Sequence, residues 1–294
     1  MLASVLASPK QRMGWLIAVA TTIGAASFVL AAEPPSQPVL REAHFDAADD
    51  RIVNATATYR LLIEKGQSFN MPYQGQSAPP RLSAEVAMDG SQSLALTIGP
   101  SAPSQTQNDR SEFTVAHQGD PLALRLGEDR YLGFGVFFSE AGFPPPTAEI
   151  IVCQIWQAYR DHATGPPAFI VMEPNSNDLS FRLATRDDGD PKSVAVPLSR
   201  AKFVPGSWNA VVLHVLPRAD GDPAGPGVIE IWLNGHHLGG ARRFWGYAVP
   251  NSVDAFDVRV GMYGNPQPAA HSLWIDRVRW GLSRAAVDPS GTVQ

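Results

Sequence analysis

Short apolar runs follow one another along most of the chain, many of them alternating with polar positions. They are rich in Val, Ile, Phe, Tyr and Trp, and clusters of Gly, Pro, Asp and Asn separate them, as is typical of β-strands and turns. No stretch beyond the N-terminal segment keeps a helical spacing of apolar residues. The sequence therefore predicts an all-β chain folded as a sandwich or jelly roll of two antiparallel sheets. The predicted strands are YLGFGVFF (131–138), EIIVCQIWQ (149–157), AFIVMEP (168–174), LSFRLATR (179–186), WNAVVLHVLP (208–217), GVIEIWLNG (227–235), FDVRVGMYG (256–264) and HSLWIDRVRWG (271–281).

Two segments between the predicted strands have a more specific pattern. Asn234 and Gly235 end the strand at 227–235, and an Asn-Gly pair supplies the positive φ angles that a tight hairpin turn needs. A strand that ends in W-x-N-G is frequent in concanavalin A-like sandwiches, whether they are binding modules, hydrolases or lyases. The segment QSFNMPYQGQSAPP, residues 67–80, predicts a long loop, either a functional lid or a solvated surface excursion.

The N-terminus has the pattern of a secretory signal. Lys10 and Arg12 precede an apolar segment, residues 15–30, and the small residues Ala31 and Ala32 follow it. We expect residues 1–32 to be a signal peptide and residues 33–294 a single β domain that is secreted or periplasmic. The alternative is an uncleaved membrane anchor, since the apolar run is marginal in length for a bilayer span. No later segment of the sequence is long and apolar enough to span a membrane.

Charge and cysteine content narrow the possible functions. Removal of residues 1–32, with their two cations, takes the formal net charge from −5 to −7. This balance argues against a nucleic-acid binder with a broad basic face. Cys153 is the only cysteine, so the chain has no intrachain disulfide, and its apolar neighbours predict a small buried residue and not a nucleophile.

Three segments combine polar and aromatic positions: N-D-R-S-E-F (108–113), Q-I-W-Q (154–157) and R-V-G-M-Y-G-N (259–265). If each is a strand, side chains alternate between its two faces. Arg110 and Glu112 then share one face of the first strand. Gln154 and Trp156 share one face of the second, with Ile151, Cys153 and Ile155 toward the core. On the third strand Arg259, Gly261 and Tyr263 share a face, and Val258, Val260 and Met262 pack inward. The three polar faces can line one cleft.

These residues resemble a known group of enzymes. R-S-E, Q-I-W and G-M-Y-x-N, in this order, are similar to the R-[TS]-E, Q-[IV]-H and K-A-G-x-Y-x-Q motifs of the jelly-roll polysaccharide lyases, which include alginate, glucuronan and heparin lyase I-type enzymes. Gln154 and Gln157 ahead of Pro166 and Pro167, with the closing W-I-D-R-V-R-W-G, resemble the glucuronan and heparin lyase I branch most. The resemblance covers roughly residues 43–283.

The resemblance implies a secreted lyase that cleaves a uronate-containing polysaccharide by β-elimination. Arg110 and Gln154 match the positions that neutralise the substrate carboxylate, which makes the C5 proton acidic. Tyr263 matches the tyrosine that acts as acid, and also as base in a syn elimination. The resemblance also implies substrate contacts at Glu112, Trp156, Gln157, Arg259, Asn265 and His162, an anionic polysaccharide or oligosaccharide as partner, and a monomer.

The chain also departs from the family motifs. Trp156 stands where relatives hold a histidine base, so that base is missing unless His117 or His162 reaches in from a loop. Trp156 can instead stack on a sugar ring. Thr114 replaces the second arginine of R-T-E-L-R, and Arg259 replaces the lysine of K-A-G. These differences leave the sugar, the cleavage mode and the stereochemistry open.

Several residues have simpler interpretations. Arg110 and Glu112 also fit a cross-strand charge pair, and Trp156 and Tyr263 fit ordinary packing. We expect no cofactor, although D-D-G-D at 187–190 fits either a structural calcium loop or a common turn. The competing functions are a non-catalytic, lectin-like carbohydrate-binding protein and a glycoside hydrolase of the same fold. The hydrolase needs two spaced carboxylates, and the segment from Glu149 lacks the E-x-D-x-x-E pattern.

Overall fold

The computed structural model describes residues 38–46, 50–102, 104–159, 165–186, 195–247 and 252–291. Strand contacts group Ser36–Gln294 into one unit. The predicted signal peptide at residues 1–32, the predicted substrate contact His162 and the alternative calcium loop at 187–190 lie outside the described residues.

The first of two antiparallel sheets contains eight of the described strands. The long strand β18 (His271–Gly281) lies at its centre and pairs with β9, β6 and β1. The strand order is β16-β15-β14-β9-β18-β6-β5, and β1 pairs with β18 beside this path. The other bounds are β1 (Val39–Ala43), β5 (Ala78–Ser83), β6 (Ser93–Ile98), β9 (Arg130–Phe137), β14 (Trp208–Leu216), β15 (Gly227–Leu233) and β16 (His236–Arg243).

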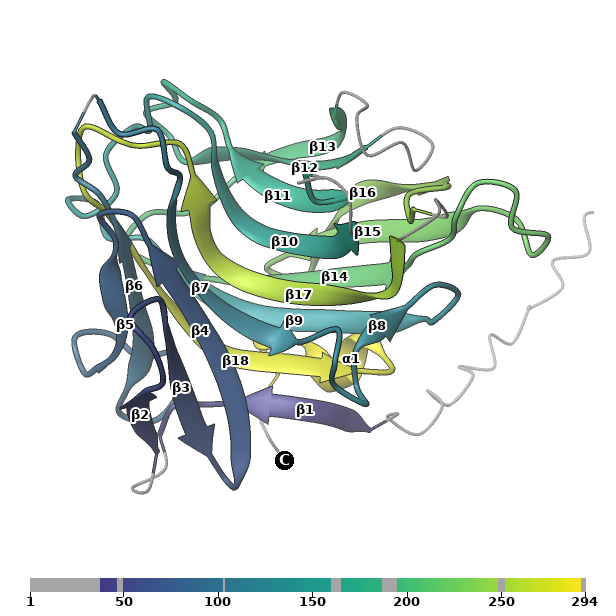
Figure 1. Cartoon of the computed structure of the whole chain (residues 1–294), viewed down its shortest axis with the longest axis horizontal. Coiled ribbons are helices and arrows are strands. Elements are labelled where there is room, and N and C mark those ends of the chain that lie inside the picture. The colour runs from purple at the N-terminus through teal and green to yellow at the C-terminus, as the bar shows by residue number, and fades with distance from the viewer. Residues whose placement is uncertain are drawn as a thin grey trace, which may run out of the picture. The chain divides into compact units, whose positions relative to one another are not determined.

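The second sheet contains ten of the described strands and carries the candidate site. Its order is β13-β12-β11-β10-β17-β7-β4-β3-β2, and β8 pairs with β17. The bounds are β2 (Arg51–Asn54), β3 (Tyr59–Glu64), β4 (Gln67–Gln74), β7 (Asp109–Ala116), β8 (Leu124–Arg125), β10 (Ile150–Tyr159), β11 (Ala168–Met172), β12 (Ser180–Arg186), β13 (Ala195–Lys202) and β17 (Ser252–Gly264). Figure 1 shows β10, β17 and β7 as long, bent neighbours in this sheet.

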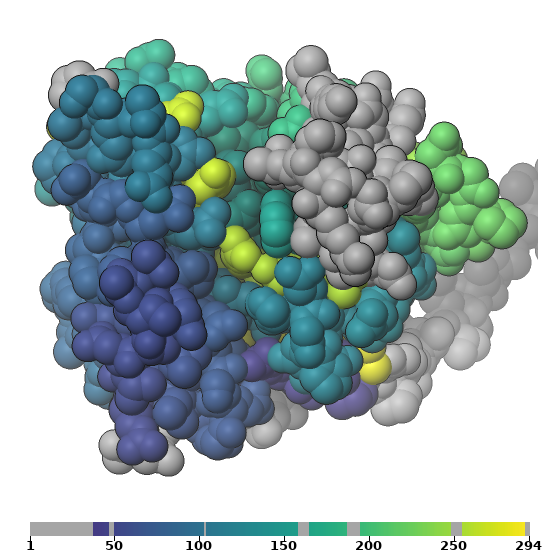
Figure 2. Space-filling view, in the orientation of Figure 1, coloured from purple at the N-terminus to yellow at the C-terminus, as the bar shows by residue number. Residues whose placement is uncertain are grey.

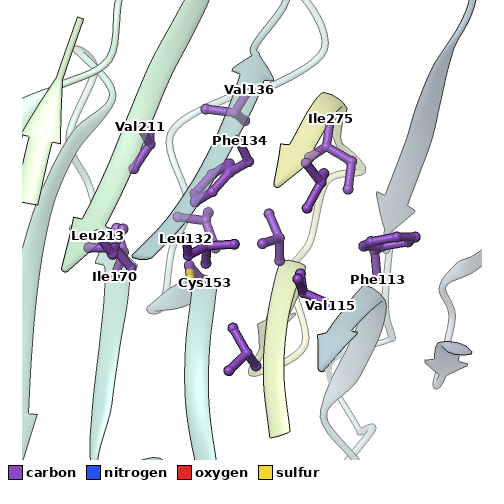
Figure 3. Close-up of a cluster of buried hydrophobic side chains, with 14 of the residues drawn as sticks. Phe113, Val115, Leu132, Phe134, Val136, Cys153, Ile170, Val211, Leu213 and Ile275 are labelled. Carbon is purple, nitrogen blue, oxygen red and sulfur yellow. The ribbon is translucent and has the colours of Figure 1, made fainter. Parts of the chain in front are cut away.

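The hydrophobic core lies between the two sheets. Phe113 and Cys153 of the ten-stranded sheet belong to the same buried cluster as Phe134 and Ile275 of the eight-stranded sheet (Figure 3). Apolar side chains from both inner faces leave the water together, and this burial is the main favourable term for a sandwich. The outer face of the ten-stranded sheet, turned away from the other sheet, is thereby free to carry polar side chains.

The eight strands predicted from apolar runs are all present, and the predicted two-sheet architecture is confirmed. Asn234 (φ 51°) and Gly235 (φ 80°) form the predicted tight turn between β15 and β16. A single turn of helix, α1 (Arg284–Val287), follows β18. Within the described ranges, no helix is long and apolar enough to cross a membrane.

The prediction of a long loop at residues 67–80 is wrong. Most of this segment forms β4 and the first part of β5. Phe69 and Met71 are buried in the core, and Phe69 stacks on Phe113 with ring centroids 5.0 Å apart. The alternation of Phe69 and Met71 with Ser68 and Asn70 was a strand signal, but the neighbouring prolines and glycine obscured it.

The predicted inward orientation of Ile151 is also wrong. The pairing of β10 with β11 and with β17 shifts register between Ile151 and Cys153. Val152 and Cys153, two consecutive residues, both belong to the core cluster, whereas Ile151 packs with Phe169 and Val171 on the outer face. A β-bulge breaks strict alternation in this way. Gln154 and Trp156, beyond the bulge, keep the outward orientation that was predicted.

Candidate active site

The outer face of β7, β17 and β10 brings the candidate catalytic residues together. Strand pairing sets Tyr263 of β17 opposite Arg110 of β7, and Arg259 of β17 opposite Gln154 of β10. The alternate residues of the same strands, such as Phe113 of β7 and Val260 of β17, point into the core. Period-two alternation therefore leaves the polar residues on the outer face.

Glu112 is the buried anchor of this cluster. Its carboxylate accepts a hydrogen bond from Gln154 Nε2 at 2.5 Å and lies 3.2 Å from Arg110 Nε and 3.7 Å from Arg259 Nη1. Burial raises the pKa of the Glu112 carboxyl above its ordinary value, and the charges of Arg259 and Arg110 oppose part of that rise. Glu112 is only 1% exposed and lies beneath the cavity described below. The Glu112 carboxylate thus contacts the two arginines and the glutamine from below the cavity.

Tyr263 has a cation and a hydrogen-bond donor as neighbours. The guanidinium carbon of Arg110 lies 4.7 Å from the centroid of the Tyr263 ring. Asn108 Nδ2 donates a hydrogen bond to Tyr263 Oη at 2.8 Å. The phenol hydrogen remains available to a substrate oxygen because Oη acts as the acceptor toward Asn108.

Arg259, which also lies near Glu112, has two further partners. Its Nη2 donates to Asp257 Oδ2 at 2.5 Å, and its guanidinium carbon lies 5.4 Å from the centroid of the Trp156 ring. Asp257 is buried and also accepts the backbone N–H of Gln118 at 2.8 Å. Arg259 therefore has a fixed orientation that differs from that of Arg110.

A cavity of about 390 Å³ lies above these residues. Its lining comprises Arg110, Gln154, Trp156, Gly165, Pro166, Arg259 and Tyr263. The structure thus brings together five residues predicted for the site. A group of donors beside a tyrosine can bind a carboxylate next to an acid or base.

The cavity continues as a groove across the strands toward β4 and β3. A neighbouring cavity of about 280 Å³ shares Arg110 and Arg259 with the first and is also lined by Tyr59 and Asn70. A third, of about 260 Å³, shares Asn70 and His117 with the second and reaches Asp120. In Figure 2 the yellow-green atoms of β17 lie in a hollow beside the blue residues of the N-terminal strands.

Other predicted site residues lie away from the cavity. Gln157 is fully buried: its Nε2 donates to Tyr247 O at 3.0 Å, and its Oε1 accepts from Tyr247 N at 2.7 Å. Alternation from Gln154 places Gln157 on the core face, so a direct substrate contact does not fit its position. Asn265 is exposed just beyond the end of β17 and does not line the cavity. His117 lines the two neighbouring cavities, and its Nδ1 accepts the N–H of Gly119 at 3.1 Å.

Cys153 is buried in the core, as predicted. Burial raises the pKa of its thiol because the thiolate is poorly solvated there. His236 and His237 lie on β16 of the other sheet. In the described part of the chain, no group of three or more His, Cys, Asp or Glu residues is placed to hold a metal ion.

The sequence analysis did not identify three residues that contact the candidate site: Asn108, Tyr59 and Asn70. Asn108 was within a highlighted segment, but its bond to Tyr263 crosses 155 positions of sequence. Tyr59 and Asn70 belong to strands that were not predicted. For Asn70, the alternation with Phe69 and Met71 was the available signal.

Comparison with known proteins identifies the family. A model of the polysaccharide lyase family matches residues 67–279. This chain belongs to the polysaccharide lyases. The resemblance drawn from the motifs is thereby confirmed for the family. No curated protein sequence matches this chain.

Solved structures agree with this polysaccharide lyase in fold. The endo-beta-1,4-glucuronan lyase of the fungus Trichoderma reesei is 23% identical, with a TM-score of 0.59, and the match covers 76% of this chain and 94% of that one. The catalytic domain of a glycoside hydrolase family 131 protein from Coprinopsis cinerea is 13% identical, with a TM-score of 0.50 and coverages of 86% and 100%. A variant of alginate lyase Aly36B in complex with alginate trisaccharide is 11% identical, with a TM-score of 0.50 and coverages of 83% and 98%. The fold alone therefore does not separate lyase from hydrolase.

Proposed function

We propose that this lyase cleaves a uronate-containing polysaccharide by β-elimination in the groove across β10, β17 and β7. The observation that supports the proposal best is the convergence of Arg110, Gln154 and Tyr263 on one cavity. The substrate class is an anionic polysaccharide or oligosaccharide.

Arg110 and Gln154 bind and neutralise the carboxylate at C5 of the sugar that loses its proton. Gln154 Nε2 gives one hydrogen to Glu112 and carries a second that can bind the substrate. Charge-assisted hydrogen bonds to this carboxylate stabilise the enolate-like charge that develops when the C5–H bond breaks. Each such donor contributes most if it is already oriented before the reaction, and Glu112 provides that orientation.

Tyr263 transfers the proton. As a phenolate it takes the hydrogen from C5, the electron pair of that bond forms the C4=C5 double bond, and the C4–O bond to the leaving sugar breaks. The phenol then returns a proton to the departing glycosidic oxygen, so the step consumes no water and no cofactor. Arg110 lies over the Tyr263 ring, and Asn108 donates a hydrogen bond to its oxygen, so both neighbours position the tyrosine for this transfer.

Trp156 occupies the position of the family histidine, and we assign it to sugar binding. Its ring and Pro166 supply apolar surface to a cavity that is also lined by the polar groups of Arg110, Gln154 and Arg259. His117 lines only the neighbouring cavities, so Tyr263 is the better candidate base among the described residues. A syn elimination with one residue as base and acid follows from this assignment.

The hydrolase alternative lacks its required carboxylate pair. No Asp or Glu of the described residues lines the cavity around Tyr263. Asp120, in the third cavity, is bound to Arg41 at 2.6 Å. Glycoside hydrolysis commonly needs two carboxyl groups that flank the scissile bond. The lyase mechanism needs none, and it suits this cavity better.

We also propose that the chain acts outside the cytoplasm as a monomer, with residues 1–32 as its leader. Mass spectrometry of the mature N-terminus after expression in a bacterial host tests this point. A mature chain that begins near residue 33 is expected, and retention of residue 1 on a membrane-bound product would contradict it.

The activity is tested by incubating the purified protein with β-1,4-glucuronan, alginate, heparin and neutral β-glucan. Ultraviolet absorbance of the conjugated C4=C5 double bond should rise on at least one uronate polymer and not on the neutral glucan. Binding of uronate polymers without any new absorbance would instead favour the lectin-like alternative. Reducing ends without the double bond would indicate hydrolysis.

A further inference from the structure

Asp109, the first residue of β7, carries a buried carboxylate that the proposed mechanism does not use. Its two neighbours in the chain, Asn108 and Arg110, both contact Tyr263 in the candidate site. Asp109 itself is 0% exposed and does not line the cavity around Tyr263. A carboxylate is costly to bury unless hydrogen bonds satisfy it, so the partners of Asp109 show what it does at this position.

The Asp109 carboxylate accepts hydrogen bonds from two segments of the chain. The N–H of Gln76, in the turn between β4 and β5, donates to Oδ1 at 2.8 Å. Gln105 Nε2 donates to the same oxygen at 2.9 Å, and the Ser101 hydroxyl donates to Oδ2. Ser101 and Gln105 precede β7 in the chain. The carboxylate therefore joins the β4–β5 turn to the segment that leads into β7.

The β4–β5 turn fits closely against this carboxylate. Gly75 has a φ of +71°, and a Cβ there would lie 2.2 Å from Asp109 Oδ1 and 3.2 Å from Asn108 O. Gln74 Nε2, at the end of β4, donates to Asn108 O at 3.3 Å. The turn thus contacts both the Asp109 carboxylate and the backbone of Asn108.

The same network reaches the end of the strand that carries Tyr263. Ser101 N donates to Gln267 O at 2.8 Å, and the buried Gln267 side chain donates from Nε2 to Asn265 O at 3.1 Å. Asn265 directly follows β17. Hydrogen bonds therefore connect Asp109, through Ser101, with the end of β17.

We propose that Asp109 is a positioning residue for the elimination, which holds the segment before β7 so that Asn108 keeps the Tyr263 oxygen in place for proton transfer. The proposal rests on the proposed lyase function. Asn108 Nδ2 occupies a lone pair of Tyr263 Oη, which leaves the phenol hydrogen available in the cavity. A small displacement of a group that orients a reacting atom lowers the rate strongly. Asp109 acts only through Asn108 and does not touch the reacting atoms.

The first test is the steady-state kinetics of Asp109→Ala on the uronate polymer that the wild type degrades fastest. Its kcat should fall by roughly 10- to 100-fold with a much smaller change in KM, because Gln154 and Arg259, on other strands, still line the cavity. A wild-type kcat in Asp109→Ala would overturn the inference and leave the lyase function intact. No double-bond product from the wild type on any uronate polymer would instead contradict the proposed function itself.

Asp109→Asn should restore most of the kcat that is lost in Asp109→Ala. Its amide oxygen can still accept the hydrogen bonds of Gln76 and Gln105. Its amide nitrogen takes the place of Oδ2 and can donate to the Ser101 hydroxyl, which accepts as well as donates. A loss of kcat as large as that of Asp109→Ala would contradict positioning through these bonds.

A double-mutant cycle shows whether Asp109 acts through Asn108. Asn108→Ala should lower kcat, and the double variant Asn108→Ala/Asp109→Ala should be no slower than Asp109→Ala, because the group that Asp109 positions is already absent. Losses that multiply in the double variant would show two independent effects and would overturn the inference.

Asp276→Ala is the matched control for the loss of a buried carboxylate. Asp276 is also 0% exposed, and it accepts the backbone N–H groups of Met88, Asp89 and Arg277 in the eight-stranded sheet. The variant should unfold at a lower urea concentration and keep a wild-type kcat. A kcat that falls as far as in Asp109→Ala would show a general effect of lost stability and would overturn the inference.

Gln105→Ala decides the inference if Asp109→Ala fails to fold. Gln105 is half-buried and supplies one hydrogen bond to the Asp109 carboxylate. Its removal should lower kcat by roughly 3- to 10-fold, and it should cause no further loss in the Asn108→Ala background. In that case an unchanged kcat in Gln105→Ala would overturn the inference.

Discussion

Tyr263 is the residue on which the proposed chemistry depends. Its ring lies under the Arg110 guanidinium, and its oxygen accepts a hydrogen bond from Asn108. The cation–π contact depends on the ring, whereas proton transfer depends on the oxygen. The two roles can therefore be separated by a substitution that removes the oxygen alone.

We predict that Tyr263→Phe lowers kcat by roughly 10²- to 10⁴-fold with a much smaller change in KM, because general acid–base catalysis is lost while the ring remains under Arg110. Steady-state kinetics on the active uronate polymer measure both constants. Tyr131→Phe is the matched control, since Tyr131 lies in the eight-stranded sheet and stacks on His214. Near-normal turnover by Tyr263→Phe would exclude Tyr263 as the proton carrier.

At the scale of elements, the bulges in β10 and β17 shape the site. Between the pairs Cys153–Val260 and Ile151–Tyr263, β17 contains one more residue than β10. Gly261 lies in this stretch with a φ of +141°, which side-chain-bearing residues rarely adopt. Bulges increase local twist and bend, in agreement with the bent course of β17 in Figure 1. The bulge therefore helps to set the positions of Arg259 and Tyr263.

Gly261→Ala is predicted to destabilise the fold by roughly 3 kcal/mol, because backbone strain adds to a steric clash. The new Cβ would lie 2.5 Å from Ser111 O and 2.7 Å from Glu112 Cα. Urea unfolding measures the change. In Gly235→Ala the Cβ meets nothing within 4 Å, so only the strain of a positive φ remains, about 1–2 kcal/mol. Equal losses for the two variants would show that the bulge has no special requirement for glycine.

Much of this element-scale structure could be predicted from the sequence, because period-two alternation is local. This alternation predicted that Arg110, Gln154 and Tyr263 point outward from their strands. In the folded protein, strand pairing brings the three residues together. Bulges and long-range partners were not predictable in the same way. The orientation of Ile151 depends on how β10 pairs with β11 and β17, and a local pattern does not encode register. Asn108 and Asp257 acquire their roles only through folded contacts.

At the scale of the whole molecule, stability depends on buried carboxyl groups outside the groove. Asp276 of β18 is buried and accepts backbone hydrogen bonds from Met88 and Arg277 at 2.8 and 2.7 Å. Burial nevertheless raises its pKa to about 7. Burial likewise raises the pKa of Glu64 to about 6. Because both folded-state pKa values are raised, the folded state binds protons more tightly than the unfolded chain.

The stability that these groups contribute is fully present below their unfolded pKa values near 4 and is lost as the pH rises through about 6 and 7. We predict that the free energy of unfolding falls between pH 5 and pH 8 and that Asp276→Asn flattens this fall by roughly 2–3 kcal/mol. Urea titrations of both proteins at pH 5 and pH 8 give the change in the free energy of unfolding with pH. The pKa of His271 is lowered by burial, and its opposite effect is present in both proteins. The same change in the free energy of unfolding between pH 5 and pH 8 in the wild type and in Asp276→Asn would contradict the assignment to Asp276.

Cys153, the only cysteine in the chain, has a further consequence for experiments on this enzyme. It sits in the core between the sheets and is 1% exposed, so a thiol reagent reaches it only when the sandwich opens. The rate at which such a reagent modifies the native protein therefore reports opening events directly, with no engineered label. The rate of Cys153 modification thus measures how often the sandwich opens. It can be measured at the protein concentrations and pH values used for the activity assays.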